Sequence, residues 1–216
     1  MSGERKRPIW IVKLGQSLFD VPELKTWLSV LAEPRPDPMA PAIIVVPGGG
    51  PFVEAVRTTQ PVLKYGAAAA HRMALLAMEQ FAIALADLEP RLRMAASADQ
   101  LNRLRAEGAT ALWLPSRMVL GWYDVPESWE VASDSLAAWL AAELKASLLV
   151  MVKAESLPES ELVASTLVER QIVDRALPEL LSRLKAPTWC MGRDAHARFA
   201  KALAGGPLEG TRVKAG

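Results

Sequence analysis

The sequence predicts an α/β protein, a three-layer αβα sandwich with a mostly parallel central sheet. Short apolar runs of four to six residues, each closed by a turn residue, recur along the chain. This pattern is typical of strands that are buried on both faces of a sheet. Segments with apolar residues at helical spacing lie between these runs. Because 51% of the 216 residues are apolar and 23% are charged, the chain can build a sizeable core. We expect a single domain over residues 1–216.

The expected strands are the runs that end in a glycine, a proline or a comparable break. They are Ile9–Leu14, Ala42–Val46, Ala111–Leu114, Leu148–Val152 and Thr188–Met191, with Thr211–Val213 as a last edge strand.

The expected helices follow these runs. They are Val21–Leu31, Phe52–Leu63, Ala67–Ala86, Ala98–Ala106, Asp134–Lys145 and Ala195–Leu203, and the stretch Leu162–Leu184 is expected to hold two helices separated near Pro178 or earlier. Ser97 and Ser133 stand where N-caps are expected, before the fourth and fifth of these helices.

Composition excludes several classes of function. Lys and Arg number 25 against 24 Asp and Glu, so the net charge of +1 disfavours a nucleic-acid-binding protein. The single cysteine, Cys190, excludes an intrachain disulfide, and two histidines are too few for a histidine-rich metal centre. The apolar run after the basic N-terminus is too short for a secretory signal, and no stretch is suited to span a bilayer. We expect a cytoplasmic protein without membrane or nucleic-acid partners.

In a parallel sheet, ligands bind beyond the carboxyl ends of the strands. The loops after Leu14, Val46, Leu114, Val152 and Met191 are therefore the places where a site is expected.

The loop after the second strand contains Gly48, Gly49 and Gly50 and leads directly into a helix. Glycines let backbone N–H groups approach an anion closely, and the N-terminus of a helix carries a partial positive charge. A phosphate or carboxylate would be bound well here. A tight turn without a ligand explains the glycines equally well.

The loop after the first strand contains Gly15, Gln16 and Ser17, preceded by Lys13 near the end of the strand. A buried lysine needs a partner, and the Lys13 ammonium could reach a bound phosphate or extend to solvent. Ser133, Asp134 and Ser135 would cap the following helix, and Asp134 could also pair with Lys13 if the two loops converge.

These motifs resemble the amino acid kinase superfamily, which includes acetylglutamate, carbamate, aspartate and uridylate kinases. The resemblance is carried by Val12–Leu18, by Val46–Gly50, by Trp129–Ala138 and by the closing Gly210–Val213. Within the superfamily the chain is similar to small kinases of methanofuran biosynthesis, which use ATP to phosphorylate an aminomethylfuran-methyl phosphate. That similarity lies in Pro47–Phe52 with Arg57, in Ala70–Gln80 and in the short length.

The resemblance implies a phosphotransferase that uses ATP and Mg²⁺ on a small anionic substrate. Lys13, Asp134 and Lys153 would be catalytic: Lys13 contacts the transferred phosphoryl group, Asp134 orients Lys13, and Lys153 stands in for a second lysine. Phosphates would be bound by Gly15, Gln16, Ser17, Gly48, Gly49 and Gly50. Arg57, His71, Arg72, Trp129 and Ser133 would bind the acceptor.

The resemblance also implies an acceptor-side lobe over about residues 1–145, a nucleotide-side lobe over about 146–216, and a homo-oligomer. Trp122 and Trp129, which flank Tyr123, could line an aromatic pocket, although packing at a rim or interface is the commoner use of such residues.

Three departures from the family pattern leave a second interpretation open. Gln16 replaces a glycine, Met151–Ser156 replaces the nucleotide-side Thr-Asp-Val-Asp-Gly motif, and Glu169–Arg175 lacks the second lysine. The alternatives are therefore an active kinase of cofactor biosynthesis, a non-catalytic subunit or ligand-binding module with the same fold, or a uridylate- or acetylglutamate-kinase-like enzyme.

Overall fold

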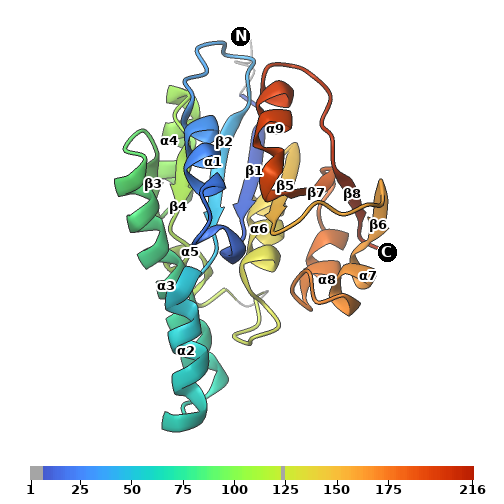
Figure 1. Ribbon diagram of the computed structural model, residues 1–216. Helices are drawn as coiled ribbons and strands as arrows, with labels where there is room; N and C mark the ends of the chain where they lie inside the picture. Colours follow the sequence, from blue (N-terminus) through green and yellow to red (C-terminus); the bar gives the residue numbers. More distant parts are fainter. Residues whose placement is uncertain (1–6, 123–124) are drawn as a thin grey trace.

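The computed structural model describes residues 7–122 and 125–216, and a single eight-stranded sheet runs through the molecule (Figure 1). The strand order is β3-β4-β2-β1-β5-β7-β8-β6. The strands are β1 (Ile9–Leu14), β2 (Ala42–Pro47), β3 (Arg93–Ala95), β4 (Ala111–Trp113), β5 (Leu148–Lys153), β6 (Glu161–Val163), β7 (Thr188–Gly192) and β8 (Thr211–Lys214).

All neighbouring strands are parallel except β7 and β8, which are antiparallel. The predicted fold class is thus confirmed, as are the six expected strands. Two details were wrong: β8 lies between β7 and β6 rather than at the edge, and two three-residue strands, β3 and β6, were not expected. Neither short strand contains an apolar run, because most of their residues are exposed.

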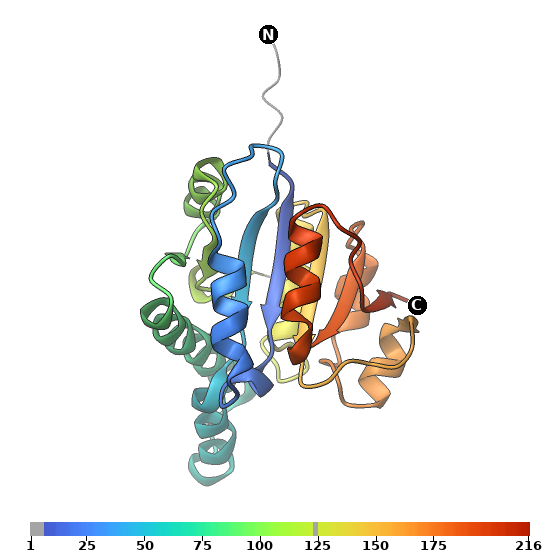
Figure 2. The same cartoon turned by 45° about the horizontal axis from the view of Figure 1, so that its top comes forward.

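Helices cover both faces of the sheet. They are α1 (Glu23–Ala32), α2 (Gly50–Leu63), α3 (Ala67–Leu88), α4 (Ala98–Glu107), α5 (Ser116–Val119), α6 (Ser133–Glu143), α7 (Ala164–Glu169), α8 (Leu177–Ser182) and α9 (His196–Leu203). Figure 2 shows α1 and α9 side by side on one face. Their apolar side chains pack on Val12, Leu14 and their neighbours, whereas α4, α6 and α8 pack on the opposite face, which carries Ile9 and Ile11.

Helix α6 begins differently from the expectation. The N-cap residue is Ala132, and the Ser133 side chain makes no capping hydrogen bond. By contrast, the Ser97 side chain accepts a hydrogen bond from Gln100 N–H and caps α4 as predicted. The predicted cap of α6 was wrong because Ser133 already lies in the first turn.

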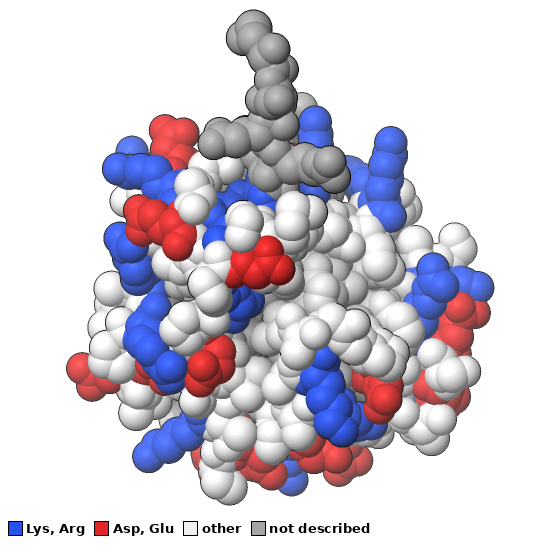
Figure 3. All heavy atoms as spheres, turned by 90° about the horizontal axis from the view of Figure 1, so that it is seen from above, with Lys and Arg blue, Asp and Glu red and all other residues white. Residues whose placement is uncertain are grey.

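Seen from the end at which the strands begin, basic and acidic side chains alternate around the rim (Figure 3). This mixture agrees with the net charge of +1. Within residues 7–122 and 125–216, no helix is long and apolar enough to cross a membrane. The α2–α3 hairpin projects from the opposite end of the molecule, where β1 and β2 finish (Figure 1).

Candidate functional site

Strand register places two lysines on the same face of the sheet. β1 and β5 are parallel neighbours, with Lys13 opposite Met151, so Lys153 lies two residues further along β5. Because side chains alternate between the faces of a strand, Lys13, Met151 and Lys153 all point to one side. That side is the one covered by α6, and the two ammonium groups therefore meet its first turn.

The carboxylate of Asp134, in the first turn of α6, joins both lysines. Lys13 Nζ lies 2.8 Å from Asp134 Oδ1, and Lys153 Nζ lies 2.6 Å from Asp134 Oδ2. Lys153 Nζ also donates to the carbonyl oxygen of Ile172 at 2.8 Å. The exposed fractions of Lys13, Asp134 and Lys153 are only 4%, 3% and 8%. The structure thus brings together the three residues predicted to be catalytic, and Lys13 does not extend to solvent.

Burial and charge act in opposite directions on these groups. Burial alone would raise the pKa of Asp134, but the two ammonium groups lower the pKa of Asp134 to about 2. Burial lowers the pKa of Lys13, and the nearby Lys153 acts in the same direction. The pKa of Lys153 is raised, because attraction to Asp134 outweighs its burial. Asp134 therefore stays ionised and holds two positive groups where the strands end.

A fourth charged residue, Asp174, was not identified from the sequence. It lies between α7 and α8, and its Oδ2 accepts hydrogen bonds from the N–H groups of Asp134 at 2.8 Å and Ser135 at 3.0 Å. Asp174 thereby supplies the cap that α6 lacks within its own sequence. Burial, and then the negative charge of Asp134, raise the pKa of Asp174 to about 6. Its only sequence signal, an aspartate shortly before Leu177, is that of an ordinary cap for α8.

These four residues line a cleft of about 520 Å³. The other lining residues come from the loops after β1 and β5, from α2, from the start of α6 and from the segment before α8; they are Gly15, Gln16, Ser17, Arg57, Ala132, Ser133, Ala154, Glu155, Leu157, Gln171 and Ile172. Three lining residues are basic and three are acidic, so the ionised cleft is formally neutral.

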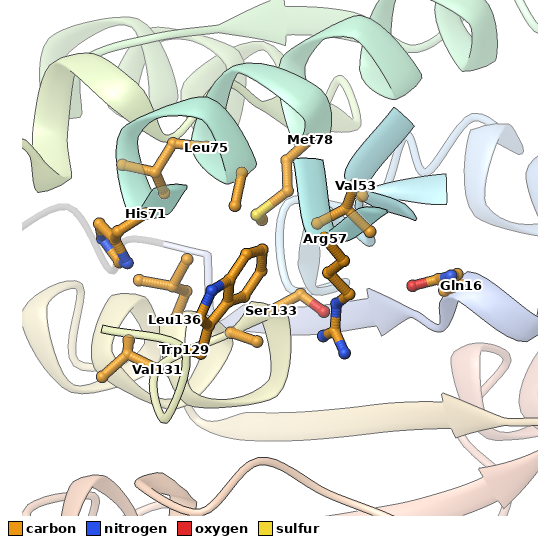
Figure 4. A pocket seen from close by; sticks show the side chains of 13 residues that line it. Gln16, Val53, Arg57, His71, Leu75, Met78, Trp129, Val131, Ser133 and Leu136 are labelled. Carbon is orange, nitrogen blue, oxygen red and sulfur yellow. The ribbon is translucent and has the colours of Figure 1, made fainter. Parts of the chain in front are cut away.

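A second, smaller cavity adjoins the cleft, because Gln16, Arg57, Ala132 and Ser133 line both. It measures about 40 Å³. Figure 4 shows Arg57 between Trp129 and Gln16. The Arg57 guanidinium carbon lies 4.9 Å from the centre of the Trp129 ring, and Trp129 Nε1 donates to Gln60 Oε1 at 2.6 Å. The cation–π contact holds Arg57 at the junction of the two cavities.

His71 lines the small cavity from the α3 side, together with Leu75 and Met78 (Figure 4). Its exposed fraction is 3%, and its Nδ1 lies 3.3 Å from the carbonyl oxygen of Ser128. Burial lowers the pKa of His71, so the ring is neutral near pH 7. Because a carbonyl only accepts, Nδ1 carries the proton. His71 Nε2 is then a buried acceptor, without a hydrogen-bond partner among the described residues.

The glycine loops contribute less than the sequence predicted. Gly15 N–H donates to Val152 O at 3.1 Å, and Gly48 N–H donates to Leu14 O at 3.0 Å, so neither is free for a phosphate. Gly50 has a φ of +53° and opens α2, where the first N–H groups have no partner within the helix. Gly49 lines the small cavity, whereas Gly48 and Gly50 line neither space.

The remaining predicted site residues divide into two groups. Gln16 and Ser17 line the cleft, but the Gln16 side chain donates to Glu54 Oε1 at 2.9 Å. Arg72 lines neither cavity: it is exposed and pairs with Glu127 at 3.3 Å, so the structure does not bring it to the site. Trp122 packs on Trp139 away from Trp129, and Tyr123 lies outside the described residues.

No family model matches the chain. A curated relative, the [5-(aminomethyl)furan-3-yl]methyl phosphate kinase of Methanocaldococcus jannaschii, is 28% identical over 131 residues. The match covers 60% of this chain, and this chain spans 58% of the relative's length.

Solved structures show the same fold over nearly the whole chain. The uridylate kinase of Archaeoglobus fulgidus has a TM-score of 0.69 at 15% identity and covers 96% of this chain and 100% of its own. The UMP kinase of Ureaplasma parvum has a TM-score of 0.67 at 14% identity. That match covers 97% of this chain and 100% of the UMP kinase. The aspartate kinase of Synechocystis has a TM-score of 0.65 at 13% identity, covering 95% of this chain and 39% of its own. The resemblance to the amino acid kinase superfamily is confirmed.

Proposed function

From its amino acid kinase fold, we propose that this chain is an ATP-dependent kinase of cofactor biosynthesis that phosphorylates a small phosphomonoester. The observation that carries the proposal is the bridge from Asp134 to Lys13 and Lys153, in a cleft that adjoins a second cavity. The large cleft would take the phosphates of ATP, and the small cavity would take the acceptor.

The proposed reaction is an in-line transfer. An oxygen of the acceptor phosphate forms a bond to the γ-phosphorus, and the bond from that phosphorus to the ADP oxygen breaks. Lys13 and Lys153 neutralise the charge on the transferred group, and Asp134 fixes both ammonium groups before the substrate arrives. Such a site works by positioning and electrostatics, without a covalent enzyme intermediate.

The small cavity supports an acceptor built on one small ring. Its volume of about 40 Å³ is much smaller than the 520 Å³ of the adjoining cleft, so it suits a small substituted ring better than the ribose and base of a nucleoside. Apolar side chains and Trp129 surround the space, and His71 Nε2 would accept a hydrogen bond from an amine or hydroxyl of the ligand. Arg57, at the junction, would bind the acceptor's phosphate. An aminomethylfuran-methyl phosphate, the substrate named for the curated relative, has these features.

Magnesium would enter with the nucleotide. Among residues 7–122 and 125–216, no group of three or more His, Cys, Asp or Glu side chains could hold a metal ion. Both oxygens of Asp134 face ammonium groups. Bound together with ATP, Mg²⁺ would neutralise part of the charge on the phosphates. In this proposal the chain supplies two lysines, Lys13 and Lys153, to the same phosphates.

A non-catalytic binding module is the second candidate, favoured by the equal numbers of acidic and basic residues in the cleft. Gln16 adds to this argument, because it lines both cavities at a position where the family it resembles has a glycine. Measurable turnover by the unmodified protein would exclude this candidate. If the unmodified protein is inactive and Gln16→Gly gains activity, the module is favoured.

Two measurements test the kinase proposal. Calorimetric titration with Mg-ATP should give a dissociation constant in the micromolar to millimolar range, and Lys13→Ala should weaken it. Phosphorus NMR of the protein with Mg-ATP and [5-(aminomethyl)furan-3-yl]methyl phosphate should show a new diphosphate together with ADP. If the unmodified protein binds no nucleotide, the kinase proposal is wrong. If it binds ATP but yields no diphosphate, the acceptor is wrong.

The lobe division, a homo-oligomeric state and a cytoplasmic location remain predictions. Light scattering of the purified chain measures the oligomeric state directly. A structure with Mg-ATP would test whether the nucleotide lies against the segment from residue 146 onward.

A further inference from the structure

The loop between α7 and α8 lines the cleft with Gln171, Ile172 and Asp174, and Asp174 is the acid among them. Its Oδ2 accepts both N–H bonds from the first turn of α6, and Asp174 also lines the cleft. Within the described parts of the chain, Oδ1 has no hydrogen bond. One oxygen therefore anchors α6, and the other is available to a ligand in the cleft.

The hydrogen bonds between Asp174 and α6 matter because this helix carries Asp134. The two N–H groups belong to Asp134 and Ser135, so Asp174 fixes the backbone from which the Asp134 carboxylate reaches Lys13 and Lys153. The second contact from the same segment is the Ile172 carbonyl oxygen, which accepts from Lys153 Nζ. The loop between α7 and α8 therefore positions both Asp134 and Lys153.

The charges around Asp174 come from every element that borders the cleft. They are Lys13 on β1, Lys153 at the end of β5, Asp134 on α6, Arg57 on α2 and Glu155 in the loop after β5. With Asp174 ionised, the three positive and three negative groups cancel. A polyphosphate brings several negative charges into this neutral cleft, and protonation of one acid would make its binding more favourable.

Asp174 is the acid best suited to take up that proton. Burial and the charge of Asp134 place the pKa of Asp174 at about 6, whereas the pKa of Asp134 is about 2. A protonated Asp174 keeps Oδ2 as the acceptor for α6, and its Oδ1–H becomes a donor toward a phosphate oxygen.

We infer that Asp174 is a positioning residue, which anchors the first turn of α6 and takes up one proton from solvent when a polyphosphate enters the cleft. The inference rests on the proposed function for the identity of the ligand. It goes beyond that function by coupling the occupancy of the site to proton binding.

The experiment compares Asp174→Asn, Asp174→Ala and the matched control Asp99→Asn, an exposed acid in the first turn of α4. Asparagine preserves the acceptor oxygen but removes the titration, whereas alanine removes both. Mg-ATP affinity is measured by calorimetry from pH 5.5 to 8.5, in buffers of different ionisation enthalpy. Thermal unfolding is measured at pH 7.

As the pH rises above 6, the Mg-ATP affinity of the unmodified protein and of Asp99→Asn should fall. The affinity of Asp174→Asn should fall less steeply, by a difference of up to about tenfold per pH unit. Proton uptake on binding should be smaller by up to one proton in Asp174→Asn. Asp174→Ala should melt about 2–4 °C below Asp174→Asn, since only alanine loses the cap.

Equal pH slopes in the unmodified protein and Asp174→Asn would overturn proton uptake, and equal melting of the asparagine and alanine variants would overturn anchoring. Either result leaves the kinase proposal intact if ATP still binds. If ATP does not bind at any pH, the kinase proposal and proton uptake fail together, and the melting comparison alone decides the anchoring role.

Discussion

Lys153 Nζ lies 2.6 Å from Asp134 Oδ2, and the same carboxylate contacts Lys13 through its other oxygen. One buried acid thus holds two buried bases at the ends of adjacent parallel strands. Asp134 is needed for stability as well as for the proposed transfer, because neither lysine is paired with another carboxylate among the described residues.

Asp134→Asn should lower the free energy of unfolding by about 3–5 kcal/mol, because it leaves two desolvated ammonium groups without the carboxylate that pairs with them. The matched control is Arg72→Ala, which removes the exposed pair with Glu127 and should cost less than about 1 kcal/mol. Urea unfolding at pH 7 measures both. Similar losses in the two variants would mean that the bridge contributes no more than a surface pair.

Lys153→Met should reduce kcat of the proposed transfer by about 10²–10³-fold, the usual cost of removing one group that stabilises transition-state charge. Lys13 still pairs with Asp134 in this variant, so the fold should persist. Lys185→Met, at an exposed position, serves as the control. If kcat is unchanged in a folded Lys153→Met protein, Lys153 does not replace the second lysine of the family.

The sequence was sufficient to place Lys13, Lys153 and Asp134, because each lies at a recognisable strand end or near the start of a helix. The fold was predictable for the same reason: buried parallel strands form apolar runs, and amphipathic helices lie between them. The three-residue strands β3 and β6 were missed because they hold mostly exposed residues and show no such run.

Long-range contacts explain what could not be predicted. Asp174 caps a helix 40 positions away in the sequence, and locally it looks like a cap for α8. The N–H groups of Gly15 and Gly48 appear free in a glycine-rich loop, but neighbouring strands accept from them. Arg72 and His71 are adjacent in sequence, yet helix geometry turns His71 into the cavity and Arg72 to solvent.

Trp129→Ala should raise KM for the phosphomonoester about tenfold and change kcat less. The indole holds Arg57 by a cation–π contact and forms part of the cavity wall, so its loss removes binding that the ground state and transition state share. The control is Trp122→Ala, because Trp122 lines a different cavity. Steady-state kinetics with varied acceptor at saturating Mg-ATP measures the effect. A fall in kcat alone would place Trp129 outside the acceptor site.

Two buried acids of the cleft, Asp134 and Asp174, should affect stability in opposite directions as the pH changes. The folded-state pKa of Asp134, about 2, is below its ordinary value of 3.8, so its contribution is complete above pH 4 and is lost as pH falls toward 2. The folded-state pKa of Asp174, about 6, is above 3.8, so its contribution is present below pH 4 and is lost as pH rises through 6. Each change should be about 1–3 kcal/mol.

Asp174→Asn should therefore remove the decline in stability between pH 4 and 6 and leave the decline below pH 4 unchanged. Urea unfolding at pH 3, 4, 5, 6 and 7 measures the difference in unfolding free energy between the variant and the unmodified protein. That difference should grow in favour of the variant as pH rises from 4 to 7, because asparagine has no charged form to desolvate. A difference that stays constant across this range would show that the buried environment of Asp174 does not disfavour its carboxylate.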